Sequence, residues 1–218
     1  MRADTQVTER RPRLRIGRPE GHDHPVAVGA RGRFDAYGPR LTHTWIAEAP
    51  DLRHRSLDGT LGFFDVVGYT NLTERLARAG AAGAEAVTET TDRLFDALID
   101  PVLDAGGDVL QFSGDALLIL FAGEGHARRA CTAAREMQRV MAEVGQVETL
   151  AGRARLRMSA GLHSGPVDLV LMGEAQRMVL AVGPTTTGCL LAEKAAGPDE
   201  LLVTPATAAA IPTTWEIG

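Results

Sequence analysis

Lysine and asparagine are almost absent from this 218-residue chain, in which Lys194 is the only lysine and Asn71 the only asparagine. Any mechanism that needs either residue type at another position is therefore excluded for the chain by itself. Cysteine is also scarce, because Cys131 and Cys189 are too few for a disulfide framework. We expect both thiols to lie inside the fold as small apolar side chains.

Long apolar runs are missing as well. The longest, Ala116–Ala122, is far shorter than the roughly 20 residues that span a membrane, and the N-terminus has no apolar stretch of the signal-peptide type. The composition, 44% hydrophobic and 23% charged residues, is ordinary for a soluble globular protein. We therefore expect a cytoplasmic protein without a membrane span, formed by one sizeable domain and a tail.

Charge is unevenly distributed along the chain. Residues 1–40 hold nine arginines against five acidic residues, a net charge of +4, whereas the remainder holds fourteen basic against twenty-three acidic residues, a net charge of −9. The composition of the first segment predicts a disordered basic arm over 1–40, with a nucleic-acid or membrane tether as the alternative. The acidic remainder, 41–218, is the predicted folded domain, and its charge argues against nucleic acid as a partner.

The hydrophobic pattern beyond position 40 predicts alternating helices and strands. Helices are expected over 41–50, from about 70, from about 84, over 126–144, over 187–195 and in a short Ala-rich segment near the C-terminus. Thr70 or Thr73 is the expected cap of the helix that begins near 70. The helix that begins near 84 is expected to kink or end at Pro101. Gly80 and Gly83 are expected to interrupt the second and third helices. Strands are expected over 60–67, 108–112, 116–121, 156–162, 167–172, 178–182 and 200–203.

The order βααββαβ, followed by further strands, predicts an α+β fold. It is a ferredoxin-like core with a C-terminal extension, in which helices cover one face of the sheet. In such a core the first strand and the following hairpin are neighbours.

Two aspartates are placed unusually in this pattern. Asp65 lies in an apolar strand, where a carboxylate must be paired, hydrogen-bonded or bound to a metal. Asp115 lies at the tip of a tight hairpin with apolar flanks. Taken singly, Asp115 could be a turn former and Asp65 a helix cap set back a few residues. Taken together in the predicted core, the two carboxylates converge at one edge of the sheet.

Converging carboxylates without nearby histidine or cysteine favour Mg²⁺ or Mn²⁺ over zinc. Between Asp65 and the next helix, Gly68 would let backbone amides approach a polyphosphate at the helix N-terminus. Metal ions beside a phosphate cradle predict phosphoryl or nucleotidyl transfer by a two-metal route.

Three segments resemble the signatures of class III adenylate and guanylate cyclases. Phe64–Thr70 (FDVVGYT) resembles F-x-D-[IV]-x-G-[FY]-T, Gly107–Leu118 (GDVLQFSGDALL) resembles G-G-D-[IVL]-[IVL]-K-F-x-G-D-A-L-L, and Gly161–Gly165 (GLHSG) resembles G-[IL]-H-[ST]-G. The details are most similar to the first cyclase domain of soluble adenylyl cyclases and their bacterial tandem relatives.

The resemblance implies a site shared between two domains that pack head to tail. One domain supplies the two metal aspartates, here Asp65 and Asp115, which together with the backbone of Val66 would bind two Mg²⁺ or Mn²⁺ ions. The other domain supplies a Lys and an Asp or Thr that select the purine, and an Asn and an Arg that stabilise the transition state. The phosphates of ATP or GTP would lie along a short backbone segment, formed by Val66, Val67, Gly68, Tyr69 and Thr70.

The residues that the other domain supplies in the family are replaced in this chain. The purine-selecting positions, the Asn position and the Arg position correspond to Gln111, Pro184, Thr187 and Leu191. Leu191 can make no charge-assisted bond to a phosphate. Lys194 is the only lysine and Asn71 the only asparagine, so a different alignment of the sequence with the family would not supply the missing groups. We therefore expect the isolated chain or its homodimer to be inactive.

A third phosphate-contact position, usually basic in the family, corresponds to Ser159. Arg157 points to the same face of the predicted strand and could reach the phosphates, with a structural surface arginine as the alternative.

The favoured hypothesis is the metal-bearing half of an adenylate cyclase that converts ATP to cyclic AMP and pyrophosphate. The complementary cyclase domain would lie downstream of Gly218 or on another protein. The alternatives are a catalytically silent cyclase-homology domain that regulates a partner, and one half of a guanylate cyclase. A diguanylate cyclase or polymerase palm is disfavoured, because the chain has no G-G-[DE]-E-F hairpin.

Overall fold

The computed structural model describes residues 39–174 and 177–211. The basic arm predicted over 1–40 thus lies almost wholly outside the described residues. In chain order the elements are α1 (Arg40–Glu48), β1 (His54–Val67), α2 (Tyr69–Ala77), α3 (Ala81–Asp104), β2 (Asp108–Ser113), β3 (Ala116–Ala122), α4 (His126–Val144), β4 (Gln146–Thr149), β5 (Gly152–Arg155), β6 (Arg157–Met172), β7 (Met178–Val182), α5 (Pro184–Ala195), β8 (Leu201–Val203) and α6 (Pro205–Ala209). The predicted α+β class is confirmed.

The main sheet has the strand order β2-β3-β1-β6-β7, and β8 pairs in parallel with β6. The other strand pairs of this sheet are antiparallel, and β1 and β6 pair along their length from His54–Val170 to Val67–Arg157. β1 is therefore a central strand. Asp65, two residues from the end of this strand, lies at the end of the sheet.

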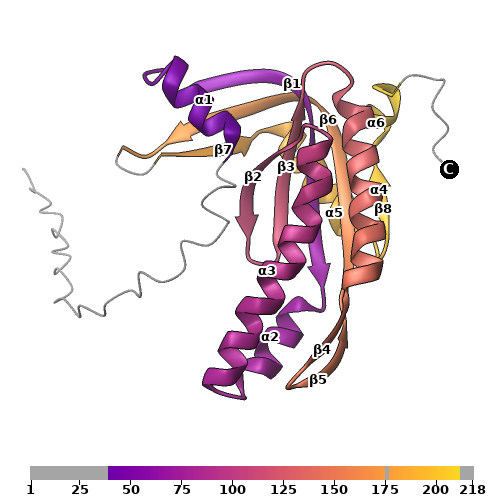
Figure 1. Cartoon of the computed structure of the whole chain (residues 1–218). Coiled ribbons are helices and arrows are strands. Elements are labelled where there is room, and N and C mark those ends of the chain that lie inside the picture. Colours follow the sequence, from indigo (N-terminus) through magenta and orange to yellow (C-terminus); the bar gives the residue numbers. More distant parts are fainter. Residues whose placement is uncertain (1–38, 175–176, 212–218) are drawn as a thin grey trace, which may run out of the picture. The chain divides into compact units, whose positions relative to one another are not determined.

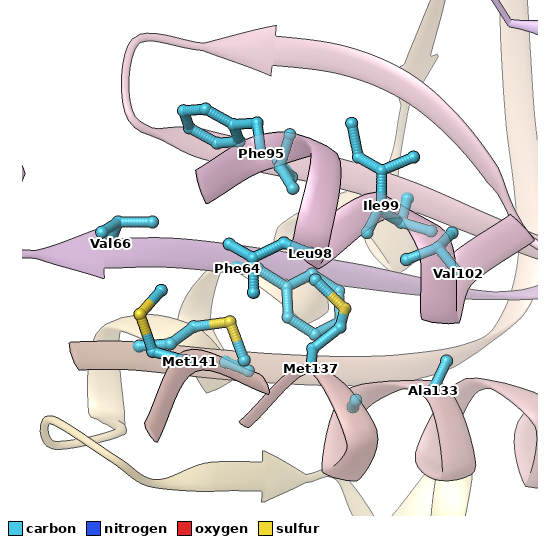
Figure 2. Packing of buried hydrophobic residues seen from close by; sticks show 14 of the residues in the cluster. Phe64, Val66, Phe95, Leu98, Ile99, Val102, Ala133, Met137 and Met141 are labelled. Atoms are coloured by element: carbon cyan, nitrogen blue, oxygen red, sulfur yellow. The ribbon is translucent and has the colours of Figure 1, made fainter. Parts of the chain in front are cut away.

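One face of the sheet is covered by α2, α3 and α4. Phe64 and Val66 of β1 point into this larger core, where they meet Leu98 of α3 and Met137 and Met141 of α4 (Figure 2). Each helix contributes one apolar stripe, as the sequence periodicity predicts. Because alternate residues of a strand face opposite sides, burying Phe64 and Val66 here turns Asp65 to the other face.

The prediction that helices cover only one face is wrong. A second core on the opposite face contains Trp45 of α1, Leu61 of β1 and Cys189 of α5. α5 packs on β6 and β1, while β7 approaches β2 (Figure 1). The described helices therefore lie on both faces, and α5 shares its face with Asp65. Both cysteines are buried, as predicted.

The two strands predicted over 156–162 and 167–172 are one continuous strand, β6. Along its first half the residues that enter the larger core are Met158, Ala160 and Leu162, and along its second half the residues that enter the second core are Val167, Leu169 and Leu171. The strand keeps its alternation while the more deeply buried face changes. Because the apolar positions change from one face to the other, the sequence pattern predicts two strands where the structure has one.

The start of α2 also differs from the prediction. Gly68, with φ of 96°, is the residue before the helix, and no side chain caps it. Thr73 instead donates to the carbonyl of Thr70. The predicted cap by Thr70 or Thr73 is therefore wrong.

Gly83 and Pro101 both lie inside α3, which runs on to Asp104. The predicted interruption at Gly83 and the early end at Pro101 are therefore wrong. Gly83 has a packing reason, because a Cβ there would lie 1.8 Å from the carbonyl oxygen of Leu76 in α2.

A hairpin that the sequence analysis did not predict, β4–β5, follows α4. It lies beside α2 at one end of the sheet (Figure 1), and the Arg75 guanidinium donates to the carbonyl of Ala151 in its turn. Among the described residues, no helix is long and apolar enough to cross a membrane.

Candidate active site

Asp65 is held between two strands that come from distant parts of the sequence. On one side it pairs with Ala116 of β3, the neighbour of Asp115, and on the other side with Ser159 of β6. The carboxyl is partly buried. The structure thus brings together the two aspartates that the sequence singled out.

Asp115 is tied to the end of β1 and to the start of α2. Its carbonyl oxygen accepts a 3.3 Å hydrogen bond from the amide of Val66. Its Oδ2 accepts a 3.1 Å hydrogen bond from the hydroxyl of Thr70. These bonds fix the β2–β3 turn against the segment that connects β1 to α2.

The environment of Asp65 opposes its ionisation. Burial is the largest cause, followed by the charges of Asp115 and Glu193, and together they raise the pKa of Asp65 from 3.8 to about 6. A carboxylate in this position gains stability from a cation, because the cation offsets both the desolvation and the repulsion.

The connection between β1 and α2 leaves backbone donors available. The first intrahelical bond of α2 runs from the amide of Leu72 to the carbonyl of Gly68, so the preceding amides, including those of Tyr69 and Thr70, have no partner within the helix. The left-handed conformation of Gly68 is one that glycine adopts without strain. Such a helix start is suited to an anion.

The side chain of Tyr69 points away from this helix start. Its hydroxyl lies 2.5 Å from the hydroxyl of Thr91 in α3, and its ring packs edge-on against Phe95. Tyr69 therefore anchors α2 to α3, and only its backbone is available to a phosphate.

The donor set fits a hard divalent cation. It consists of two carboxylates with a backbone carbonyl, that of Val66, between them in sequence. No group of three or more histidine, cysteine, aspartate or glutamate side chains in the described ranges is arranged to hold a metal ion. Mg²⁺ is commonly bound through one or two carboxylates and keeps several of its waters, so two carboxylates are compatible with this ion.

The four family positions that are replaced lie on two separate elements. Gln111 is in β2 opposite Leu118, just after a β-bulge. Pro184 is the first residue of α5, the hydroxyl of Thr187 donates to the carbonyl of Gly183, and the side chain of Leu191 is 61% exposed. An exposed leucine at the arginine position supplies no positive charge.

Ser159 and Arg157, both in β6, lie on the same face of the sheet as Asp65. The hydroxyl of Ser159 donates a 2.7 Å hydrogen bond to Oε1 of Glu193 in α5. The Arg157 guanidinium is 3.9 Å from the carboxylate of Asp199, in an exposed and therefore weak ion pair.

Glu193 was missed by the sequence analysis. The only sequence feature that could have pointed to it is its place two positions after Leu191, the leucine that replaces the family's arginine. Only the packing of α5 on β6 reveals its proximity to Asp65.

No family model matches the chain. The chain is similar to mammalian proteins named adenylate cyclase type 10, with 27% identity over 155 residues in rat, 29% over 162 residues in rabbit and 28% over 152 residues in human. These matches cover 68–69% of this chain. The chain itself spans about a tenth of the length of these relatives.

Solved structures share the fold. The guanylyl cyclase Cya2 aligns with a TM-score of 0.65 and 24% identity, covering 74% of this chain and 81% of that one. The adenylyl cyclase CyaB from P. aeruginosa aligns with a TM-score of 0.63 and 21% identity, covering 73% and 82%. A bacterial light-regulated adenylyl cyclase aligns with a TM-score of 0.66 and 17% identity, covering 84% and 53%. The similarity to adenylate cyclase type 10 and these shared folds together confirm the resemblance predicted from the motifs.

Proposed function

We propose that this chain, a domain with the class III nucleotide cyclase fold, is the metal-bearing half of an adenylate cyclase. In this proposal it converts ATP to cyclic AMP and pyrophosphate together with a complementary cyclase domain. The observation that carries the proposal is the convergence of Asp65 and Asp115 beside the uncapped N-terminus of α2.

Each residue of the site has a role in this reaction. Asp65, Asp115 and the Val66 carbonyl would hold two Mg²⁺ or Mn²⁺ ions, which when bound supply positive charge to the triphosphate and the 3′-hydroxyl. Backbone amides at the start of α2 would hold the phosphates, and Thr70 would orient Asp115. The 3′-oxygen bonds to the α-phosphorus, the bond to the β-phosphate oxygen breaks, pyrophosphate leaves, and the hydroxyl proton passes to solvent.

The need for a partner domain follows from what this chain lacks. Gln111 and Leu191 cannot replace a purine-selecting lysine or a transition-state arginine. Loss of one such stabilising group typically lowers the rate by about 10²–10³-fold. We therefore propose that the isolated chain and its homodimer are inactive.

Two alternatives share this geometry. A catalytically silent domain that regulates a partner is favoured by the exposed Leu191, which adds an apolar side chain where the family has a charge. One half of a guanylate cyclase is favoured by the similarity to the fold of Cya2. The missing purine contacts would decide between ATP and GTP, and they lie outside this chain.

The test is reconstitution. The 218-residue chain is mixed with a second-type cyclase domain that carries the Lys, Asn and Arg, and cyclic AMP and cyclic GMP are measured with Mn²⁺ and ATP or GTP. We expect cyclic AMP only when both proteins are present. The variant Asp65→Asn should abolish it, whereas Asp92→Asn, which removes an exposed acid on α3, should not.

The outcomes separate the candidates. Cyclic GMP formed in place of cyclic AMP supports the guanylate alternative. Absence of product with every partner, or unchanged product with Asp65→Asn, would overturn the catalytic proposal.

A further inference from the structure

We infer that Glu193 is a positioning residue which, held in place by Ser159, strengthens the binding of a divalent cation at Asp65 and Asp115. This inference rests on the proposed function, because it concerns the same metal ions. It assigns to α5 a role at the metal end of the site in this chain, although α5 lacks the transition-state groups.

The position of Glu193 is fixed through the backbone. α5 lies so close to β6 that a Cβ on Gly161 would be 2.1 Å from the amide nitrogen of Glu193 and 2.6 Å from the carbonyl oxygen of Cys189. The absence of a side chain at Gly161 therefore lets this turn of α5 rest on the strand. Gly161 is two residues from Ser159 on the same face of β6, so Glu193 lies above the end of the strand near Asp65.

The side chain of Glu193 is fixed as well. Oε1 accepts the 2.7 Å hydrogen bond from Ser159, a residue that is only 4% exposed. Ser159 is the direct cross-strand partner of Asp65. Asp65 is thus flanked by acids on both sides, with Asp115 on the β3 side and Glu193 on the β6 side.

The arrangement favours cations over phosphates at this point. Glu193 does not complete a set of three ligands, since the described residues contain no such metal cluster. It would act from outside the ligand shell, through the attraction between its negative charge and the cation. The family position that is usually basic, and would attract a phosphate, is Ser159 in this chain, and its hydroxyl donates to the carboxylate of Glu193.

The experiment measures binding of Mn²⁺ alone, without nucleotide, by electron paramagnetic resonance of the free ion. Glu193→Gln keeps an acceptor for Ser159 and removes the charge, so the dissociation constant should rise about three- to tenfold. Glu193→Asp keeps the charge and should lie nearer to the wild type. Ser159→Ala keeps the charge of Glu193 but removes the hydrogen bond that holds its carboxylate, so the loss of Mn²⁺ affinity should be intermediate.

The matched control is Glu124→Gln, an exposed acid beyond the far end of β3, which should bind Mn²⁺ as the wild type does. Urea unfolding of each variant reports its folding separately. If Glu193→Gln is poorly folded, Ser159→Ala and Glu193→Asp still decide the question.

Equal Mn²⁺ affinity in the wild type, Glu193→Gln and Ser159→Ala would overturn the inference. So would equal losses in Glu193→Asp and Glu193→Gln, since charge would then not matter. If Asp65→Asn binds Mn²⁺ as well as the wild type does, the proposed metal site fails, and with it the proposed function. Loss of binding in Asp65→Asn with no effect of Glu193→Gln overturns this inference alone.

Discussion

The hydroxyl of Thr70, at the start of α2, donates a 3.1 Å hydrogen bond to Oδ2 of Asp115, 45 residues further along the chain. This bond joins the two segments that would hold the phosphates and the metal ions. A hydrogen bond to a charged group stabilises by about 1.5–3 kcal/mol, and by less when it is exposed, as here.

Thr70→Val removes this donor while keeping the shape of the side chain. We expect Asp115 to lose its fixed orientation and the Mn²⁺ dissociation constant to rise about two- to fivefold. Titration with Mn²⁺ measures the effect. Thr73→Val is the control, because the hydroxyl of Thr73 bonds only to the carbonyl of Thr70 within the same helix. Equal effects of the two variants would contradict a specific role for the Thr70–Asp115 bond.

Asp65→Asn should stabilise the metal-free protein at neutral pH. The folded chain holds the proton of Asp65 more tightly than the unfolded chain, since the pKa is raised to about 6. The stability contributed by this group is therefore lost as the pH rises from about 4 through 6. With partial exposure taken into account, we expect Asp65→Asn to gain about 1–2 kcal/mol at pH 7.5 in the presence of a chelator.

Urea unfolding at pH 4.5 and pH 7.5 measures this gain, which should be small at the lower pH. Mn²⁺ should raise the melting temperature of the wild type but not that of Asp65→Asn. A variant less stable than the wild type at pH 7.5 without metal would show that Asp65 has a partner which compensates its burial.

His126 should make the protein less stable in mild acid. Its Nδ1 lies 2.7 Å from the hydroxyl of Thr60, which in turn lies 2.6 Å from the hydroxyl of Ser164. Burial lowers the pKa of His126, Asp58 partly opposes this shift, and Arg129 adds to it. Because the unfolded chain binds this proton more readily, stability is lost as the pH falls below about 6.5.

The comparison is between the wild type, His126→Gln and the exposed-site control His43→Gln, unfolded in urea from pH 5.5 to pH 7.5. We expect the loss at acid pH to be smaller in His126→Gln and unchanged in His43→Gln. A constant difference between the wild type and His126→Gln across this range would rule out titration of His126 as the cause.

Gly161→Ala should destabilise the fold by about 1–3 kcal/mol. The added methyl group would meet backbone atoms of α5, including the amide nitrogen of Glu193 at 2.1 Å, so the helix must move. Gly165→Ala, in the same strand, would meet only the side-chain oxygen of Thr185 at 3.2 Å and is the milder control. Similar unfolding midpoints for the two variants would argue against close seating of α5 on β6.

The elements with a local signal were predictable. The apolar run of β3, the stripe of α4 and the hairpin turn before Asp115 each depend on neighbouring residues, and the structure has them close to where the pattern places them. The hairpin β4–β5 has no such signal, because its four-residue strands are mostly exposed. It is held instead by contacts such as that between Arg75 and the carbonyl of Ala151.

The sequence by itself determined which chemical groups this chain possesses. Asp65 and Asp115 stand in family motifs, and no lysine, asparagine or arginine stands at the positions that would complete the site. Residue identity needs no folding to be known. Only the tertiary structure decided which groups meet, because β6 must pair with β1 and α5 must pack on Gly161 before Ser159 and Glu193 come to lie beside Asp65.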